Sequence, residues 1–375
     1  MKIAHIVTLV SPDGAFGGPV RVATNLARAT QDAGHEVMIM GAYRGYAKPP
    51  TAIDGVPVRV FPARQILPAL GFSGLVAPGL VRYLRGHISS FDLVHVHLAR
   101  DLVTLPAAAI ARSRQVPYVT QTHGMVDHSR RRLANVLDAL ATRAVLRDAA
   151  VLLHLTEQER GDLEYVARSS SLRLAHLPNG VPESDLHADV ESGREVLYLA
   201  RLHRRKRPMS FVEAAIALRK EFSLTRFTLV GADEGEASRA VGRIESARAQ
   251  DQIAWEGALD PDQTLQRMSR ASVYVLPSVD EPFPMTVLEA MSVGLPCIVT
   301  NTCGLVAAMR DEQAIRIVDD SVDNLVTELR QLLSAPAVRV DVGQRARREV
   351  EAHFSIRGVG ASVLGLYAQS LRRSA

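Results

Sequence analysis

The feature that most restricts how this chain can fold is a regular alternation of short apolar runs with segments of helical periodicity. The apolar runs are short, continuous and bounded by turn residues, as strands buried on both faces of a parallel sheet are. Helical stretches separate them, such as Val20–Ala33, which Gly34 ends, and Asp101–Arg112. The first series of predicted strands comprises Lys2–Val10, Glu36–Gly41, Val56–Phe61, Asp92–His97, Pro117–Thr122 and Ala150–Leu155. This alternation predicts an α/β fold with a doubly wound parallel sheet.

The same alternation then starts again after a polar interval, Leu177–Gly193, that has neither periodicity. The second series comprises Glu195–Ala200, Arg226–Gly231, Gln252–Gly257, Ser272–Leu276, Pro296–Thr300 and Ala314–Val318. A length of 375 residues also favours two cores over one. We therefore predict a Rossmann-like domain at 1–178, a linker at 179–194 and a second Rossmann-like domain at 195–355. Residues 356–375 are helical in pattern with no strand after them, and we expect them to pack back on the first domain.

Composition excludes several classes of protein. With 47% apolar and 22% charged residues, the chain is neither disordered nor collagen-like. Its two cysteines, Cys297 and Cys303, lack the partner ligands of a zinc site, so we interpret them as reduced structural thiols. The first residues run directly into a predicted strand without a secretory signal. The sequence contains no run of about 20 apolar residues, so we do not expect it to span a membrane. We expect a cytoplasmic protein.

The strongest motif is Ser278–Met291, which follows the fourth strand of the second series. Ligands of such sheets bind beyond the carboxyl ends of the strands. A helix opening near Met285 would direct the free amides of Met285 and Thr286, and its positive dipole end, at an anion such as a diphosphate. Glu281 before the helix and Glu289 about one turn inside could accept hydrogen bonds from the hydroxyls of a sugar and a ribose. The alternative is that Glu281 is an ordinary charge at the N-terminus of a helix and that Glu289 is a solvated charge.

A basic loop, Tyr198–Pro208, follows the first strand of the second series. Arg201 leaves the strand at once, and Lys206 precedes a helix. Together they could neutralise a diphosphate, with arginine as a fork and lysine as a point charge. The alternatives are a solvated loop and a nucleic-acid patch.

Two weaker signals lie in the first domain. Glycines of Gly14–Val20 after the first strand permit close approach of the backbone to phosphate or sugar. This loop does not match G-x-G-x-x-G, which argues against a dinucleotide cofactor. His123 ends a strand and could bond a sugar hydroxyl, although a lone histidine is more often structural. His95 and His97 share one strand face; we interpret His95 as a core residue and leave His97 undecided.

Taken together, these residues resemble the retaining glycosyltransferases of family 4, which have the GT-B fold of two Rossmann-like domains. The resemblance covers nearly the whole chain. It consists of the glycine loop, Pro178–Val181, Arg201 with Lys206, and the specific spacing Glu281-x7-Glu289. It implies that the second domain binds a nucleotide sugar in the interdomain cleft and that the first domain lies on the acceptor side.

The resemblance also implies a role for each motif residue. Glu289 would bind the ribose, Glu281 a hydroxyl of the donor sugar, and His123 the transferred sugar near the reacting carbon. The diphosphate would be held by Arg201, Lys206, the amides of Met285 and Thr286, and Gly17 and Gly18. Members of this family are thought to retain anomeric configuration by front-face attack, in which the leaving phosphate takes the acceptor's proton. Fixed cations and helix amides stabilise that phosphate, so the resemblance implies no cofactor and no metal.

The chain departs from the family pattern at three places. Pro284 stands where the family has a glycine whose amide helps to hold the donor sugar, and proline has no N–H. Ala200 replaces the glycine before Arg201, and Gly231–Gly235 is a lengthened loop. The identities of the sugar and the base therefore cannot be carried over from the family.

Three other functions compete with this prediction. A GT-B-like nucleotide-sugar epimerase would share the nucleotide site but would need no acceptor. A phosphorylase is conceivable, although no pyridoxal-phosphate lysine signature is recognisable. A nucleic-acid-binding protein would use His203–Arg207, but it leaves Glu281 and Glu289 unexplained and lacks interleaved aromatic residues. The partners we expect are a nucleotide sugar and a glycan or lipid-linked acceptor, and no nucleic acid.

A predicted helix, Ser129–Arg147, bears on the acceptor. Its apolar stripe contains Leu133, Val136, Leu137, Leu140 and Ala144, with a basic edge of Arg130, Arg131, Arg132, Arg143 and Arg147. One interpretation is a helix that covers the sheet. The other is a basic face that rests, with the uncharged segment Gln65–Val81, on an anionic membrane surface where a lipid-linked acceptor lies. We expect such peripheral contact at the inner face of the cell membrane.

Overall fold

The computed structural model describes residues 1–12, 17–67, 71, 73–129 and 131–374. Two compact units make up the chain. Unit 1 combines Met1–Gly180 with Ile356–Ala375, and unit 2 is Val181–Ser355. The boundary differs from the expected linker at 179–194, because residues from Val181 onward belong to unit 2. There the amides of Ala188 and Asp189 donate to the carbonyls of Val293 and Ser269.

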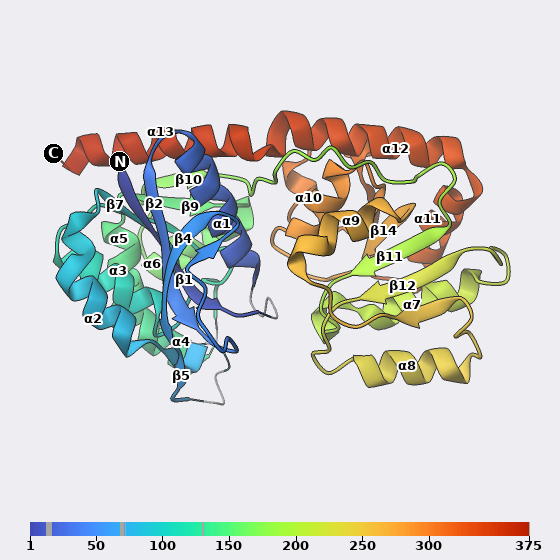
Figure 1. The fold of residues 1–375 in the computed structure, drawn as a ribbon, viewed down its shortest axis with the longest axis horizontal. Helices are drawn as coiled ribbons and strands as arrows, with labels where there is room; N and C mark the ends of the chain where they lie inside the picture. Colours follow the sequence, from blue (N-terminus) through green and yellow to red (C-terminus); the bar gives the residue numbers. More distant parts are fainter. Residues whose placement is uncertain (13–16, 68–70, 72, 130, 375) are drawn as a thin grey trace. The chain divides into compact units, whose positions relative to one another are not determined.

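Unit 1 contains, among its described residues, an eight-stranded sheet in the order β10-β9-β8-β7-β1-β2-β4-β3 (Figure 1). All neighbours pair in parallel except β3 and β4. Its strands are β1 (Lys2–Val10), β2 (Glu36–Tyr43), β3 (Ala52–Ile53), β4 (Val56–Pro62), β7 (Leu93–His97), β8 (Tyr118–Gln121), β9 (Val151–His154) and β10 (Leu174–His176). A short antiparallel pair, β5 (Arg64–Gln65) and β6 (Leu75–Val76), lies outside it.

Helices cover both faces of this sheet (Figure 1). They are α1 (Gly17–Asp32), α2 (Pro78–His87), η2 (Ile88–Ser90), α3 (Thr104–Ser113), α4 (Arg132–Leu137), the π-helix η3 (Asp138–Thr142), α5 (Arg143–Asp148), α6 (Glu157–Ala167) and α13 (Ile356–Ser374). The C-terminal helix α13 packs against α1, and the buried Tyr367 hydroxyl reaches His95 in β7. The end of the chain therefore belongs to the first core.

Unit 2 contains, in the residues described, a six-stranded parallel sheet in the order β13-β12-β11-β14-β15-β16. Its strands are β11 (Glu195–Leu199), β12 (Arg226–Val230), β13 (Ile253–Trp255), β14 (Val273–Leu276), β15 (Cys297–Thr300) and β16 (Arg316–Val318). Its helices are η4 (Arg204–Lys206), α7 (Pro208–Leu218), α8 (Ala237–Ser246), η5 (Pro261–Gln263), α9 (Thr264–Ser269), α10 (Met285–Ser292), η6 (Val306–Ala308), η7 (Glu312–Ala314), α11 (Val322–Ser334), α12 (Pro336–Glu349) and the π-helix η8 (Val350–Phe354).

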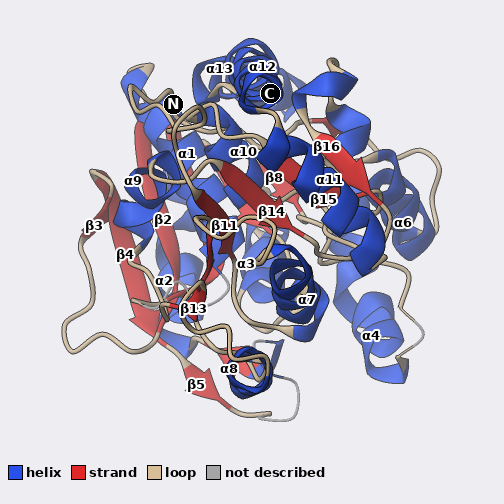
Figure 2. Cartoon of the chain, turned by 90° about the vertical axis from the view of Figure 1, so that its right-hand side faces the viewer, coloured by secondary structure: helices blue, strands red, loops and turns tan. Residues whose placement is uncertain are grey.

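The strand order decides where each unit can bind a ligand. In unit 2 the chain builds outward from β11 to β13 on one side, then returns to the middle and builds outward from β14 on the other. Figure 2 shows β11 and β14 side by side at this point of reversal. In unit 1 the reversal lies between β1 and β7. Connections leave such a pair of strands in opposite directions, and the crevice at their carboxyl ends is where ligands of doubly wound sheets bind.

The predicted α/β fold with two parallel sheets is confirmed, and every strand of both predicted series is present. The sequence missed β10 and the short strands β3, β5 and β6, which are too short to show a period. The predicted helix Ser129–Arg147 is divided into α4, η3 and α5, and Arg130 lies outside the described residues. Both cysteines are buried free thiols. No helix within the described ranges combines the length and the apolar character needed to cross a bilayer.

Candidate active site

The predicted nucleotide site of unit 2 lies at the carboxyl ends of β11 and β14. β11 ends at Leu199, and the basic loop with the single turn η4 follows directly. β14 ends at Leu276, and the loop that carries Glu281 leads into α10. Because these strands are neighbours, two motifs that are far apart in the sequence meet at the point of reversal.

Lys206 and Glu281 form an ion pair at this point. Lys206 Nζ lies 2.5 Å from Glu281 Oε2, and Arg205 Nη2 lies 3.9 Å from the same oxygen. The side chains of Lys206 and Glu281 are only 14% and 11% exposed. Burial lowers the pKa of Lys206, and the Glu281 carboxylate opposes that shift. The sequence assigned the two groups to different parts of a ligand, whereas here each is the other's partner.

Arg201 takes part in an ion pair other than that of Lys206 and Glu281. Its guanidinium pairs with Glu234 in the loop after β12, and both side chains are about one-third exposed, at 36% and 30%. The lengthened loop Gly231–Gly235 thus supplies a carboxylate to a residue expected to bind diphosphate. A diphosphate at this position would have to compete with Glu234 for the guanidinium.

Helix α10 begins at Met285, as expected, with Pro284 as its N-cap. Pro284 offers no side-chain cap; its carbonyl accepts hydrogen bonds from the amides of Val287 and Leu288. Helical geometry provides no acceptor inside the helix for the amides of Met285 and Thr286. The Thr286 hydroxyl lies 2.9 Å from the hydroxyl of buried Tyr274, which holds the first turn against β14. The helix start can therefore receive an anion.

Glu289 lies in the second turn of α10 and is 5% exposed. The solvated alternative for this carboxylate is therefore wrong. A carboxylate in such surroundings needs hydrogen-bond donors to offset its desolvation. The two hydroxyls of a ribose are donors of this kind.

In unit 1, the point of reversal between β1 and β7 holds a residue that the sequence analysis missed. Asp101 is fully buried; its carboxylate accepts hydrogen bonds from the Thr8 hydroxyl at 2.5 Å and from the amides of Val103 and Thr104 at 2.8 and 2.6 Å. Burial raises its pKa, and these hydrogen bonds oppose the shift. Asp101 therefore ties the end of β1 to the start of α3. An aspartate three residues before the start of a helix was the available signal.

The predicted glycines open α1. Gly17 is its first residue and Gly18 its second; a Cβ at Gly18 would meet none of the described residues within 4 Å. Packing within the protein therefore does not require glycine at position 18. Residues 13–16 of the glycine loop lie outside the described residues.

His123 follows β8 in a left-handed conformation with φ +51°, which is uncommon for a residue with a side chain. The buried carboxylate of Glu159 fixes this turn. It accepts from the Thr122 hydroxyl at 2.5 Å and from the Gly124 amide at 2.7 Å, on either side of His123. Its other oxygen accepts from the Leu155 amide at 2.7 Å. Glu159 is a second residue that the sequence analysis missed, because nothing in its spacing links it to His123.

His123 also ends a row of histidines that crosses three strands. His97 Nδ1 lies 2.8 Å from His123 Nε2, and His97 Nε2 lies 3.1 Å from His5 Nδ1. His5, His95 and His97 are fully buried, and His123 is partly exposed. His95 is a core residue as predicted, and the undecided His97 connects the core to His123.

Within the described part of the chain, one group of potential metal ligands is His5, His95 and His97, whose ligating atoms lie within 4.8 Å of one another. His95 and His97 make an angle of 11°, His5 and His97 one of 26°, and His5 and His95 one of 37°. His5 Nδ1 and His97 Nε2 lie 3.1 Å apart, so these two nitrogens form a hydrogen bond with each other. The chain also contains an Asp-x-Asp sequence, Asp260-Pro261-Asp262, a pattern found at metal sites of other transferases. Here the Asp260 carboxylate accepts a hydrogen bond from the Asp262 amide and caps the turn η5.

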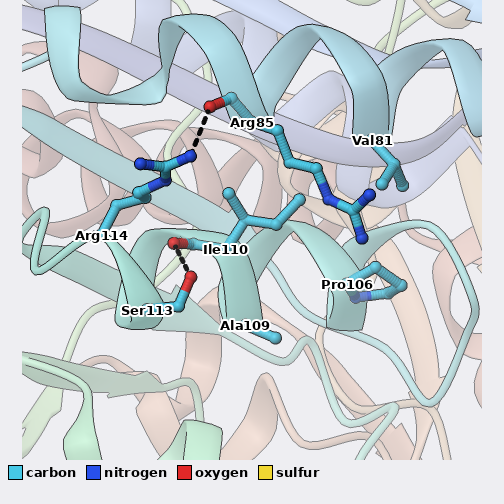
Figure 3. Close-up of a pocket in the computed structure, with 7 residues that line it drawn as sticks. All are labelled: Val81, Arg85, Pro106, Ala109, Ile110, Ser113 and Arg114. Carbon is cyan, nitrogen blue, oxygen red and sulfur yellow. Dashed lines mark hydrogen bonds between the residues drawn. The ribbon is translucent and has the colours of Figure 1, made fainter.

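A cavity of 350 Å³ lies elsewhere in unit 1, between α2 and α3 (Figure 3). Val81, Pro106 and Ile110 form its apolar wall, and Arg85 and Arg114 lie at its edges. Arg114 donates to the Arg85 carbonyl at 3.1 Å. None of the predicted site residues lines this cavity.

Sequence comparison agrees with the fold. Residues 17–180 match the model of the glycosyl transferase 4-like domain, and residues 186–349 match that of the glycosyl transferases group 1. The two matches fall on the two units and together span most of the chain. The chain therefore belongs to the group 1 (family 4-like) glycosyltransferases, which have the GT-B fold. These matches give no support to an epimerase or a nucleic-acid-binding protein.

The chain is similar to several characterised proteins over nearly its whole length. It is 24% identical to glycogen synthase of Mycobacterium tuberculosis, covering 96% of this chain and 93% of that protein. Sucrose-phosphate synthase of Thermosynechococcus elongatus has a TM-score of 0.77 at 20% identity, with both chains covered completely. The Anabaena protein HepE in complex with UDP and glucose has a TM-score of 0.78 at 16% identity, covering 98% and 99% of the two chains. At these identities the solved structures show the shared fold alone.

Proposed function

We propose that this glycosyltransferase moves a hexosyl group from a nucleoside-diphosphate sugar to a hydroxyl of a lipid-linked or cell-envelope glycan, with retention of anomeric configuration and without a metal. One observation carries the proposal. At the point where the strand order of unit 2 reverses, Lys206, at the end of η4, and Glu281, in the loop before the start of α10, form an ion pair. A diphosphate, with its negative charge next to hydroxyl-rich groups, matches these residues. The solved relative HepE is in complex with UDP and glucose, which supports a nucleotide-sugar donor.

The proposed chemistry assigns one task to each group. The acceptor hydroxyl attacks the anomeric carbon, the bond from that carbon to the β-phosphate oxygen breaks, and the leaving phosphate takes the acceptor's proton. Lys206 has two N–H groups besides the one directed at Glu281, and these stabilise the charge that develops on the leaving phosphate. Arg201 and the amides of Met285 and Thr286 add to this stabilisation from fixed positions.

The carboxylates bind hydroxyls. Glu281 fixes Lys206 and offers its remaining lone pairs to a hydroxyl of the donor sugar. Glu289, inside α10, binds the ribose. Gly17 and Gly18 approach the diphosphate, and His123 contacts the transferred sugar. The positive charge that this arrangement supplies is the reason for proposing that neither metal nor cofactor takes part.

A pair of variants tests the assignment. Glu289→Ala should weaken nucleoside-diphosphate binding by roughly 1.5–3 kcal/mol, the contribution of charge-assisted hydrogen bonds. Glu281→Ala should lower turnover and leave nucleotide binding almost unchanged, because Lys206 remains. Thermal-shift titrations with a panel of nucleoside diphosphates measure binding, and product formation from the nucleotide sugar measures turnover. Glu245→Ala, an exposed carboxylate of α8, is the matched control.

The outcome that would reject the site is wild-type binding and turnover in both variants. An epimer formed from the nucleotide sugar alone, without acceptor, would reject transfer as the activity. NMR of the product's anomeric centre decides between retention and inversion.

The surface of α4 supports the membrane part of the proposal. Leu133, Val136 and Leu140 lie on one ridge of α4 and η3 and are 55%, 53% and 78% exposed. The interpretation of this stretch as a sheet-covering helix is therefore wrong for these three residues, although Leu137 packs against the core. Exposed leucines on a helix flanked by arginines are typical of interfacial segments.

The basic edge is smaller than the sequence indicated. Arg143 and Arg147 donate to the carbonyls of Val166 and Ala167 at 3.2 and 2.7 Å, so they hold α5 to α6. Arg131 and Arg132 are exposed beside the apolar ridge.

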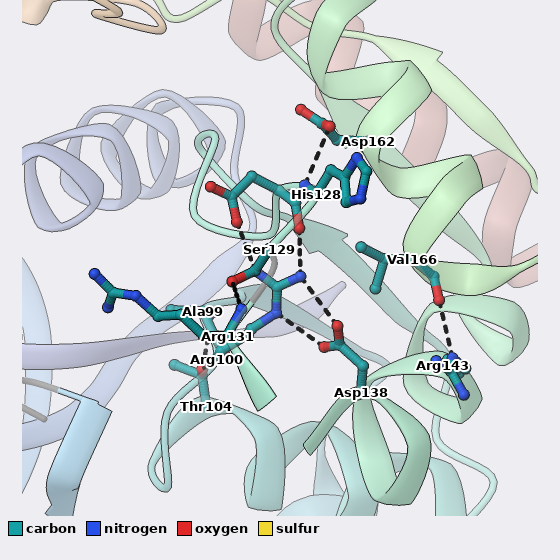
Figure 4. A network of polar contacts seen from close by, with 11 residues as sticks. Ala99, Arg100, Thr104, His128, Ser129, Arg131, Asp138, Arg143, Asp162 and Val166 are labelled. Carbon is teal, nitrogen blue, oxygen red and sulfur yellow. Dashed lines mark hydrogen bonds and ion pairs between the residues drawn. The ribbon is translucent and has the colours of Figure 1, made fainter. Parts of the chain in front are cut away.

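A polar network with one buried ion pair, Arg100–Asp138, lies next to α4 and η3 (Figure 4). Arg100 forms ion pairs with Asp138 at 2.9 Å and Asp127 at 2.8 Å, and the His128 amide donates to Asp162 at 3.2 Å. The ridge therefore rests on an ordered base. The apolar Ile66 and Leu67, next to β5, are also 54% and 45% exposed. Figure 1 shows β5 and α4 in the lower part of unit 1, whereas Figure 2 shows them on opposite sides of the view.

Liposome flotation tests the membrane contact. The enzyme should bind vesicles that contain anionic lipid and dissociate as salt rises, since each arginine near such a surface contributes about 1 kcal/mol. Replacing Arg130, Arg131 and Arg132 by Ser, or Leu133 and Leu140 by Ser, should weaken binding. A triple variant of Arg28, Arg44 and Lys48 to Ser, exposed residues of the same unit, is the control. Absence of salt-sensitive binding would leave a soluble acceptor as the better answer.

A further inference from the structure

The histidine row of unit 1 connects His123 to the core through two hydrogen bonds in series. From inside outward, His5 Nδ1 contacts His97 Nε2 at 3.1 Å, and His97 Nδ1 contacts His123 Nε2 at 2.8 Å. Strands β1 and β7 fix the two inner rings, and the turn held by Glu159 fixes the outer one. Only Nδ1 of His123 remains for a ligand, because its Nε2 is directed at His97.

The rings of this row are neutral at physiological pH. Burial lowers the pKa of His5 and that of His123 to about 3. The pKa of His97 is lowered by burial and by the neighbouring histidines. A neutral imidazole carries one N–H donor and one acceptor nitrogen. Two hydrogen bonds in series therefore have to run in the same direction, and the whole row has two states: Nδ1–H on all three rings, or Nε2–H on all three.

The inner end of the row decides between these states. His5 is fully buried, and its Nε2 has no hydrogen-bond partner among the described residues. With Nε2–H on all three rings, His5 would carry a buried N–H donor without an acceptor, and an unsatisfied buried donor is costly. With Nδ1–H on all three rings, the N–H groups of His5 and His97 both have acceptors within the row. His95, whose Nδ1 lies 2.6 Å from the Tyr367 hydroxyl, contributes equally to both states.

We propose that His97 and His5 are positioning residues that hold His123 as its Nδ1–H tautomer, so that His123 presents a hydrogen-bond donor to an oxygen of the sugar nucleotide and has no lone pair with which to act as a base. This inference rests on the proposed contact between His123 and the transferred sugar. A hydroxyl or phosphoryl oxygen fits the site, and a group that only donates does not. His5 and His97 act through His123 and touch no substrate.

Nitrogen NMR tests the tautomer without any assay of activity. In the ¹⁵N-labelled full-length protein at neutral pH, the His123 signals should show protonated Nδ1 and unprotonated Nε2. In His97→Phe, which removes the donor to His123 Nε2, His123 should lose that fixed tautomer. In His97→Asn the side-chain amide lies close to the position of Nδ1 and keeps a donor, so the tautomer should persist. An Nε2–H tautomer of His123 in the wild-type protein would overturn the proposal.

Kinetics tests the consequence for the reaction. His97→Phe should lower kcat about tenfold with little change in KM, the loss expected for one misdirected hydrogen bond, and His97→Asn should restore most of it. Tyr118→Phe is the control, because it removes a buried hydrogen bond of 2.7 Å to the Val145 carbonyl outside the row. Wild-type kcat in His97→Phe together with a changed tautomer would refute the positioning role. Full activity of His123→Ala would instead refute the proposed contact of His123, and the tautomer result would stand.

Discussion

Acidification should destabilise unit 1 far more than unit 2. His5, His95 and His97 are fully buried in unit 1, and their pKa values are lowered from an unperturbed 6.5; that of His5 falls to about 3. Between the lowered pKa and the unperturbed pKa, these histidines bind protons in the unfolded chain and not in the folded chain. The free energy of unfolding therefore rises with pH in this window and falls on acidification.

The magnitude follows from the same linkage. One histidine that titrates only when unfolded lowers the free energy of unfolding by about 1.4 kcal/mol between about pH 7.5 and about pH 5.5. The three fully buried groups give about 4 kcal/mol, a large part of the 5–15 kcal/mol typical of a domain. His123, whose pKa burial also lowers to about 3, adds up to about 1.4 kcal/mol in the same direction. Buried His154 acts in the same direction, and Asp101, whose pKa burial raises, acts in the opposite one.

Unit 2 provides an internal control, since its histidines, His187, His203 and His353, are exposed. The single tryptophan of the chain, Trp255, lies in β13 and reports the urea unfolding of unit 2 by fluorescence. Hydrogen exchange of peptides from β1 and β7, corrected for the intrinsic effect of pH, reports unit 1. The measurement is made with EDTA, so that release of a metal cannot mimic the loss.

A variant isolates the cause. His95→Leu should reduce the difference in stability between the two pH values by about 1.4 kcal/mol, because comparison within one variant cancels its packing cost. Equal protection of β1 and β7 at both pH values, or an equal loss in unit 2, would refute the reasoning.

Two further results are expected. Sugar transfer should continue in EDTA, and Arg201→Ala should cost about 2–4 kcal/mol of transition-state stabilisation, like the loss of a preorganised oxyanion donor. A loss of activity on chelation that Mg²⁺ or Mn²⁺ restores would contradict the proposed source of positive charge. Glu159→Ala should lower turnover and leave nucleoside-diphosphate binding in unit 2 unchanged, because it releases the turn that carries His123. The control, Glu157→Ala, removes an exposed carboxylate of the same helix and should leave turnover unchanged. Equal turnover in the two variants would show that the turn does not depend on Glu159.

The sequence by itself determined the strands, the two-core organisation and the start of α10. These depend on local properties: a continuous apolar run forms a buried strand, and a helix begins where proline and free amides permit it. It also placed the residues after β11 and β14 at the carboxyl ends of strands, where ligands of such sheets bind. That both motifs hold one ligand followed only from the resemblance to the glycosyltransferase family.

Only the tertiary structure decided which side chains are partners. Lys206 and Glu281 lie 75 positions apart, and His5 and His97 lie 92 apart, so no local pattern connects them. The sequence could not predict that Leu133, Val136 and Leu140 are exposed. Periodicity shows which residues share a helix face, but it does not show what covers that face. The same holds for Asp101 and Glu159. A buried carboxylate is placed by the backbone amides and hydroxyls that surround it, and those come from other elements of the fold.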